Sequence, residues 1–273
     1  MPSKNQSKKE GLGPVRESYF IKSVKLAKSN TNKIALMILF DVLFVIAAFS
    51  LNKISKYFSQ SIYVQQLLWP IVTFIVLYLF YYLLMLLVYS FFKYLVLDYI
   101  KSLFEKSEFS FDRLGQFYGL NVVVAGIFFA SLVIFNYILN YIQQSYRPIV
   151  FIIVAAPYLL FLYIMLNSSH SLFYNGSSIL ASLKNGIKIT FTKIKVYRET
   201  ILFMIIAALL LWLLFFSAGY IIRLSASKNY SFYLSAYSYY KQATIIVFDV
   251  VLYFVILINR ITFYSLIKER NAQ

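Results

Sequence analysis

The chain has 273 residues, of which 61% are hydrophobic and only 13% are charged, whereas an ordinary soluble domain is about 25% charged. The apolar residues form long runs rather than alternating with polar ones, which argues against a soluble fold and against a transmembrane barrel. The absence of cysteine excludes disulfides, thiolate nucleophiles and cysteine-bound metal, and the net charge of +16 falls almost entirely between the apolar runs, where it indicates membrane topology and anionic lipid rather than nucleic acid.

The apolar runs predict the transmembrane helices. A helix needs about 20 largely apolar residues to cross a bilayer core of about 30 Å, and six stretches meet this length. They lie at about 34–51, 67–90, 120–141, 148–166, 200–222 and 243–264. The sequence therefore predicts an all-α polytopic integral membrane protein, with a six-helix transmembrane domain at 34–267.

Basic amphipathic segments are expected next to the membrane. Residues 1–33 form a basic tail in which "VRESYFIKSVKLAKS" predicts an interfacial helix, and the long connections 91–119 and 167–199 are expected to be helical and amphipathic too. In the second connection an apolar face is accompanied by a basic face that we expect to contact lipid headgroups. The apolar face has Ile187, Phe191 and Ile194, and the basic face has Lys184, Lys188 and Lys195. We therefore predict three helical hairpins, each preceded by an interfacial helix.

The distribution of Lys and Arg predicts the orientation. Of the 26 Lys and Arg residues, 20 lie in the tail, the second and fourth connections and the carboxyl end, and 6 lie on the opposite side. Because positive residues accumulate on the cytoplasmic side, both termini, including the tail 268–273, are predicted to be cytoplasmic. The expected location is the cell membrane.

Two acidic residues stand inside apolar runs, Asp41 in "ILFDVLF" and Asp249 in "IVFDVVL". An ionised aspartate at a helix centre costs about 2.5–3.5 kcal/mol on insertion scales, so such residues often face a bundle interior or an ion pathway. Alternatively each bonds a polar group on a neighbouring helix and fixes packing. Each lies about 12 Å from an opposite face of the membrane, which argues against a paired carboxylate site.

Three further residues in or near the spans are candidates for a functional role. Arg260 lies three turns beyond Asp249 on the same helix face and either lines a polar stripe or extends to the interface. Pro157 is expected to kink the fourth helix. His170 is the single histidine, and one imidazole without neighbouring carboxylates makes neither a metal site nor a catalytic triad.

No catalytic residue, cofactor or metal site is predicted, since no HExxH, GxSxG, Walker or GxGxxG pattern occurs. Asn229 in "NYS" is a possible glycosylation site on the predicted outer side. The expected partners are the bilayer, anionic headgroups on the cytoplasmic side, and a protein partner or a second copy of the chain.

The segment "GSSILASLKNGIKITFTKIKVYRETILF" is a basic amphipathic stretch that runs into a membrane helix. In this layout the chain resembles multi-pass proteins of archaea and bacteria, among them the membrane domain found beside glycerophosphodiester phosphodiesterases. The resemblance covers the second to sixth helices and implies a six-helix fold with long cytoplasmic connections. It carries over no functional residue and no activity.

Three classes of function remain open. A non-catalytic membrane-organising or partner-binding protein is favoured by the basic interfacial segments. A permease-like transporter, or a transporter subunit, is favoured by the two intramembrane aspartates and the proline. A membrane-embedded lipid or peptide enzyme is the third alternative, and no motif supports it.

Overall fold

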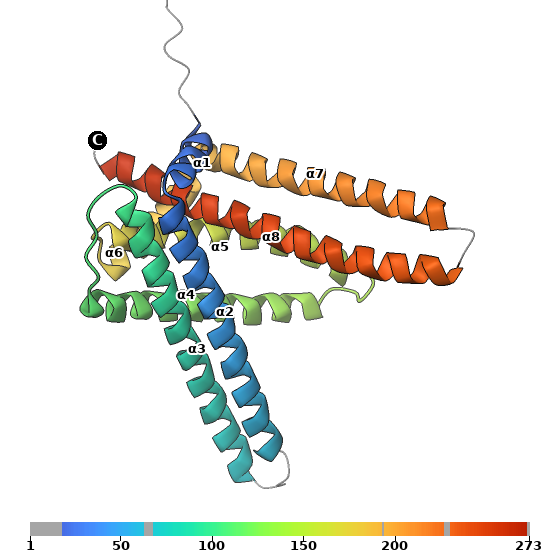
Figure 1. Ribbon diagram of the computed structural model, residues 1–273. Helices are drawn as coiled ribbons and strands as arrows, with labels where there is room; N and C mark the ends of the chain where they lie inside the picture. Colours follow the sequence, from blue (N-terminus) through green and yellow to red (C-terminus); the bar gives the residue numbers. More distant parts are fainter. Residues whose placement is uncertain (1–17, 63–67, 193, 227–229, 272–273) are drawn as a thin grey trace, which may run out of the picture.

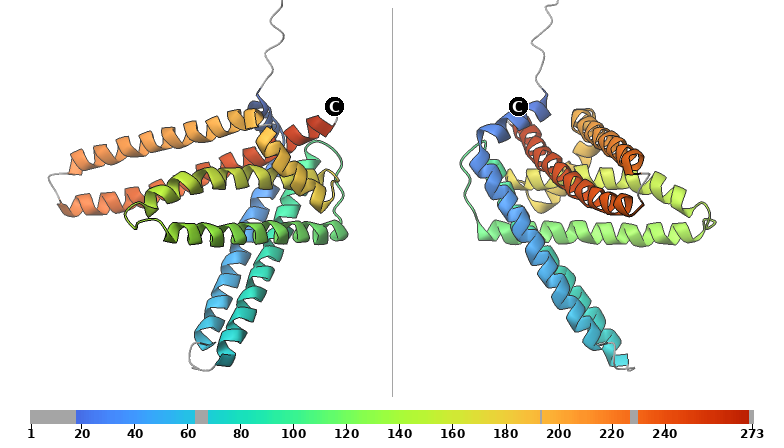
Figure 2. Two further views of the ribbon diagram at one scale, coloured as in Figure 1. Left: turned by 180° about the vertical axis from the view of Figure 1, so that it is seen from behind. Right: turned by 45° about the vertical axis from the view of Figure 1, so that its right-hand side comes forward.

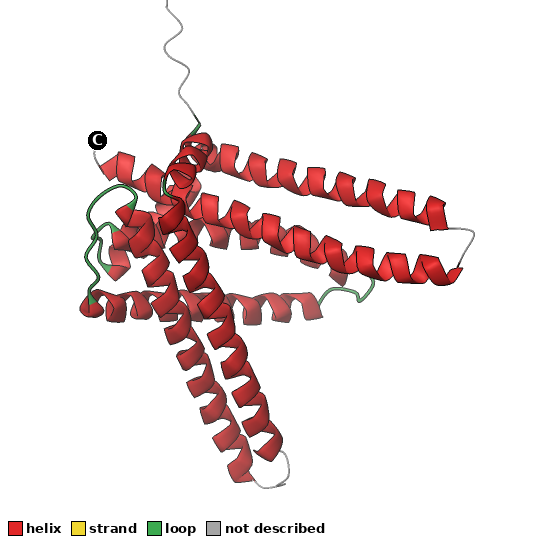
Figure 3. Ribbon diagram, in the orientation of Figure 1, coloured by secondary structure: helices red, strands yellow, loops and turns green. Residues whose placement is uncertain are grey.

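The computed structural model describes residues 18–62, 68–192, 194–226 and 230–271. Within these ranges the chain forms eight helices and no strand (Figure 3). In chain order they are α1 (Tyr19–Ser29), α2 (Thr31–Ile62), α3 (Leu68–Ser102), α4 (Phe111–Asn140), α5 (Arg147–Tyr174), α6 (Ile179–Thr192), α7 (Ile194–Ala226) and α8 (Tyr230–Asn271). Six of these described helices, all but α1 and α6, are long and apolar enough to cross a membrane. The predicted all-α polytopic class is confirmed.

Each of the six long helices extends beyond the apolar stretch that predicts it. The largest difference is at α8, which has 42 residues, so residues 230–242, which precede the predicted sixth span, are helical as well. An apolar stretch marks only the part of a helix that lies in hydrocarbon. The backbone hydrogen bonds of the helix continue into polar residues on either side of it.

Two of the three segments predicted to form interfacial helices are separate helices in the structure, α1 and α6. The expectation of a third, within 91–119, is wrong, because α3 continues to Ser102 and α4 begins at Phe111. The Ser110 hydroxyl accepts a hydrogen bond from the backbone N–H of Arg113 at 3.5 Å, which caps α4 at its first turn. From there α4 runs into the membrane span without a break.

The six long helices form three hairpins, α2/α3, α4/α5 and α7/α8, that meet at one end of the molecule (Figure 1). We call this the converging end; it contains α1, α6, the connection 103–110 and the end of α8. The ends of α2, α4 and α7 lie far from it. In every view the α2/α3 hairpin leaves the converging end in a direction different from that of the other two (Figure 2).

The core of the protein lies at the converging end. Its largest fully buried side chains include Tyr94, Phe117, Phe173 and Tyr264. Beyond this core, towards the hairpin turns, most large apolar side chains are exposed, as Val45 is at 62%. Since lipid tails are as apolar as leucine, burial in a membrane gives little hydrophobic gain, and packing and polar contacts must hold the hairpins together.

A tight turn folds α6 back onto α5. The backbone N–H of Gly176 bonds to the carbonyl of Phe173 at 3.0 Å, and that of Ser177 bonds to the carbonyl of Leu172 at 3.2 Å. These two bonds form a Schellman motif, which requires a left-handed residue after the helix. Gly176 supplies it with φ of 102°.

Small residues let α6 approach α5 closely. Ser182, Gly186 and Thr190 follow one another at four-residue spacing and are buried, so they share one face of the helix. A Cβ atom placed on Gly186 would overlap the Ser169 hydroxyl oxygen and would lie 3.2 Å from the Ser169 Cβ. Small residues of this kind allow two helix backbones to pack tightly.

Candidate functional site

An ion pair joins the first and last membrane-spanning helices. The Arg260 guanidinium on α8 donates to the Asp41 carboxylate on α2, with 2.6 Å between Nη1 and Oδ2. The Tyr253 hydroxyl donates to the same oxygen at 2.8 Å. The two charged side chains are only 16–18% exposed. Asp41 therefore makes the interhelical polar contact that was one of its two possible roles, and Arg260 faces the interior instead of the interface.

The sequence contains a signal for this pair. Asp41 lies eight residues after Lys33 on a helix that leaves the converging end, and Arg260 lies eight residues before Lys268 on a helix that returns to it. At 1.5 Å per residue both lie about 12 Å from the same end, and opposite charges at one depth in a membrane are expected to pair.

Lys93 on α3 adds a second buried cation. Its side chain is 8% exposed, and it lies within electrostatic reach of both Arg260 and Asp41. It makes no hydrogen bond or ion pair with the described part of the chain. Two basic side chains thus share one carboxylate, and an ammonium buried without its own counter-ion is costly.

A buried chain of hydrogen bonds lies beside these charges. His170 on α5 is fully buried, and its Nε2 is 2.8 Å from the Asn121 side-chain oxygen on α4. The amide of Asn121 donates to the Ser90 hydroxyl on α3 at 2.9 Å, which donates to the Leu86 carbonyl at 2.6 Å. Because the oxygen of Asn121 accepts, Nε2 carries the proton of His170. The histidine thus joins α3, α4 and α5.

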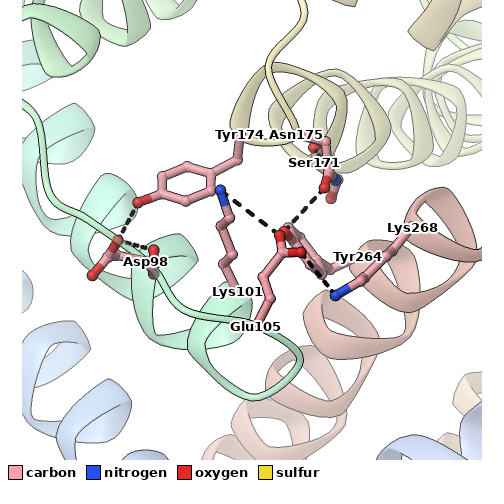
Figure 4. A network of polar contacts seen from close by, with 9 residues as sticks. Asp98, Lys101, Glu105, Ser171, Tyr174, Asn175, Tyr264 and Lys268 are labelled. Atoms are coloured by element: carbon pink, nitrogen blue, oxygen red, sulfur yellow. Dashed lines mark hydrogen bonds and ion pairs between the residues drawn. The ribbon is translucent and has the colours of Figure 1, made fainter. Parts of the chain in front are cut away.

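A second polar network closes the converging end (Figure 4). The Asp98 carboxylate accepts hydrogen bonds from the hydroxyls of Tyr174 and Ser107. The Glu105 carboxylate pairs with Lys268 at 3.1 Å and with Lys101 at 3.7 Å. These contacts tie the connection 103–110 to α3, α5 and α8, so all three hairpins are joined by polar groups at this end.

Asp249 and Pro157 lie outside these networks. Asp249 is exposed on α8 and makes no hydrogen bond or ion pair with the described residues. It lies one turn from Tyr253 on the same helix face, beyond the point where α8 packs against α2. Pro157 is exposed inside α5, which continues through it as one helix.

Two of the three predicted headgroup lysines lie on the outside of α6. Lys184 and Lys188 are exposed, while the side chain of Lys195 and the whole of Asn229 lie outside the described residues. Ile187 and Phe191, predicted to form the apolar face, are exposed at 38% and 70%. The face that packs on the protein is the one with small residues, which sequence reasoning missed although the four-residue spacing was visible.

The described residues contain no group of three or more His, Cys, Asp or Glu side chains that could hold a metal ion. Comparison with protein-family models, with curated proteins and with solved structures found no match. The resemblance in layout to the membrane domain beside glycerophosphodiester phosphodiesterases therefore stays a prediction. A function must be inferred from the geometry of this chain.

Proposed function

We propose that the protein is a non-catalytic membrane-organising protein whose converging end lies on the cytoplasmic side of the cell membrane. In this orientation α6 lies in the headgroup plane and gathers anionic lipid. The observation that carries the proposal is the division of α6 into faces. Its small residues pack on α5 together with the buried Leu183 and Ile189, while Lys184 and Lys188 are exposed beside Leu180 and Phe191.

The exposed residues of α6 form one continuous surface. At 100° per residue, Leu180, Ile187 and Phe191 fall within about 40° of one another, and Lys184 and Lys188 follow directly beside them. The exposed fractions of Leu180 and Phe191 are 78% and 70%. An apolar stripe next to a basic stripe is the arrangement by which a helix lies in a membrane interface.

Changing Lys184 and Lys188 together to Gln is expected to weaken the retention of phosphatidylglycerol by about 30-fold. Each cationic residue near an anionic membrane surface contributes about 1 kcal/mol, and a loss of about 2 kcal/mol corresponds to this factor. The measurement is native mass spectrometry of the protein released from mixed phosphatidylcholine and phosphatidylglycerol nanodiscs.

The matched control is the pair Lys53→Gln and Lys241→Gln, which removes the same charge from exposed positions far from the converging end. Equal loss in both double variants would mean that net charge, and not α6, selects the lipid. Unchanged retention after the α6 substitutions would refute the proposed role of α6.

A permease-like function is the second candidate, and Asp249 is the observation that favours it. Its carboxylate stands in an apolar segment without a partner in the described structure, as an ion-carrying group would. Asp249→Asn is expected to abolish proton flux into dye-loaded proteoliposomes while leaving the thermal unfolding temperature unchanged, because no contact is lost. Equal flux in the wild-type protein, the variant and empty liposomes would rule this role out.

A further inference from the structure

Three charged side chains lie at one level inside the membrane-spanning region. Each is eight residues, or about 12 Å, from a lysine near the converging end of its own helix. The pairs are Asp41 and Lys33 on α2, Lys93 and Lys101 on α3, and Arg260 and Lys268 on α8. The lysines are held at a common level, because they bond the Ser102 carbonyl or the Glu105 carboxylate. The three helices thus bring their charges to the same depth.

This cluster carries one positive charge more than it can neutralise. Asp41 is paired with Arg260, and Lys93 lies within electrostatic reach of both. From α5, His170 also lies within electrostatic reach of Lys93, and its buried Nδ1 has no hydrogen-bond partner in the described structure. Because Nε2 carries the proton, Nδ1 can accept one N–H of the ammonium. It brings no negative charge, so the excess remains.

The cluster also has more hydrogen-bond donors than acceptors. The ammonium of Lys93 has three N–H groups, and none is bonded within the described part of the chain. The guanidinium of Arg260 has five, of which one, on Nη1, is bonded there. The oxygen of Asp41 that accepts this bond accepts from Tyr253 as well. A negatively charged acceptor between α3 and α8 would remove both the charge excess and the donor excess.

Burial restricts the size of such an acceptor. The Lys93 side chain is 8% exposed, and His170 beside it is 0% exposed. Asp41 and Arg260 are 16–18% exposed, so the cluster is enclosed without being sealed. A phosphate group, with four oxygen atoms around phosphorus, is large for this space. A monatomic ion needs little more than the volume of one water molecule, about 30 Å³.

We propose that one small inorganic anion, chloride being the simplest example, binds between Lys93 and Arg260. The Lys93 ammonium and the unbonded N–H groups of Arg260 donate to it, while Asp41 stays paired with Arg260. Positive and negative charges then alternate from α2 through α8 to α3, and the anion joins α3 to α8 as Asp41 joins α2 to α8. The inference concerns neither α6 nor Asp249, so it can fail independently of both proposed functions.

The test measures binding of radioactive chloride to the full chain, purified in sodium gluconate and placed in phosphatidylcholine nanodiscs. We expect saturable binding of one chloride per chain. Because a ligand that binds only the folded state stabilises it, saturating chloride is expected to raise the unfolding temperature by about 2–4 °C relative to gluconate at equal ionic strength. Lys93→Met removes the charge and keeps an unbranched chain. It is expected to lower chloride binding at least about tenfold and to abolish the temperature shift.

The matched control is Lys241→Met, at an exposed position on the outer part of α8, which is expected to bind chloride like the wild-type protein. The absence of saturable binding to the wild-type protein, or equal unfolding temperatures in chloride and gluconate, would overturn the proposal, and neither result depends on the folding of a variant. Undiminished binding to Lys93→Met would place the anion elsewhere. Equal competition by inorganic phosphate would show that the site is not limited to a small ion.

Discussion

Replacing Asp41 by alanine is expected to lower the free energy of unfolding by about 3–5 kcal/mol, because removal of one partner leaves the other charge buried and uncompensated. Without the Asp41 carboxylate, the positive charges of Arg260 and Lys93 repel each other with no carboxylate to offset them. The measurement is chemical or thermal unfolding of the protein in detergent micelles, followed by the loss of helical circular dichroism.

Two further variants distinguish the effect of breaking the ion pair from the effect of removing a carboxylate that has no partner. Asp249→Ala removes a carboxylate from an exposed position with no partner in the described structure and is expected to change stability by less than about 0.5 kcal/mol. The exchange of Asp41→Arg with Arg260→Asp is expected to restore part of the loss. Equal effects of the Asp41 and Asp249 substitutions would contradict the structural role of the ion pair.

Replacing Gly186 by leucine is expected to detach α6 from α5. Even the Cβ atom of an alanine at this position would overlap the Ser169 hydroxyl oxygen, so Gly186→Ala is expected to cost about 1–3 kcal/mol and Gly186→Leu more. The detachment is measured by proteolysis of the connection 175–178, whose backbone hydrogen bonds hold it in a tight turn while α5 and α6 are packed.

Gly126 on α4 supplies the control, since nothing lies within 4 Å of a Cβ atom placed there. Gly126→Leu is expected to leave proteolysis unchanged. Ser169→Gly removes the atoms that oppose a new side chain and is expected to rescue Gly186→Ala. If the rescue fails and Gly126→Leu is as disruptive as Gly186→Leu, the close contact between α5 and α6 is not what holds α6 in place.

The number and order of the membrane helices could be predicted because length and apolar composition alone decide which segments can cross a bilayer. The rotation of each helix about its own axis, which decides the face that packs on its neighbours, could not be predicted. Helices such as α3 and α5 are apolar on all sides, so no stripe marks the face that packs. For this reason the burial of His170 and of Lys93 could not be predicted.

The candidate site could be predicted in part. Asp41 and Arg260 stand out in the sequence as intramembrane polar residues, and their equal depth would have paired them. The shared "FDV" invites a comparison of Asp41 with Asp249, which lie at different depths, whereas the charged residue at the depth of Asp41 is Arg260. An apolar pocket lined by Leu86, Phe128 and Leu159 could not be predicted, because it depends on the distances between α3, α4 and α5 and no sequence pattern records these.

Polar contacts join the three hairpins at the converging end, while the outer halves of the hairpins stand apart. Distances between paired nitroxide labels in nanodiscs test this arrangement most directly, and the lack of native cysteine makes the labelling specific. One pair is Glu105→Cys with Lys268→Cys. In the native protein the Lys268 Nζ and the Glu105 Oε2 are 3.1 Å apart. The other, Ser50→Cys with Ile134→Cys, marks exposed positions on the outer parts of α2 and α4.

We expect a short, narrow distance for the first pair and a long distance for the second, since α2 and α4 run in different directions from the converging end (Figure 1). A short, narrow distance for both pairs would contradict this arrangement, because the six helices would then form one closely packed bundle.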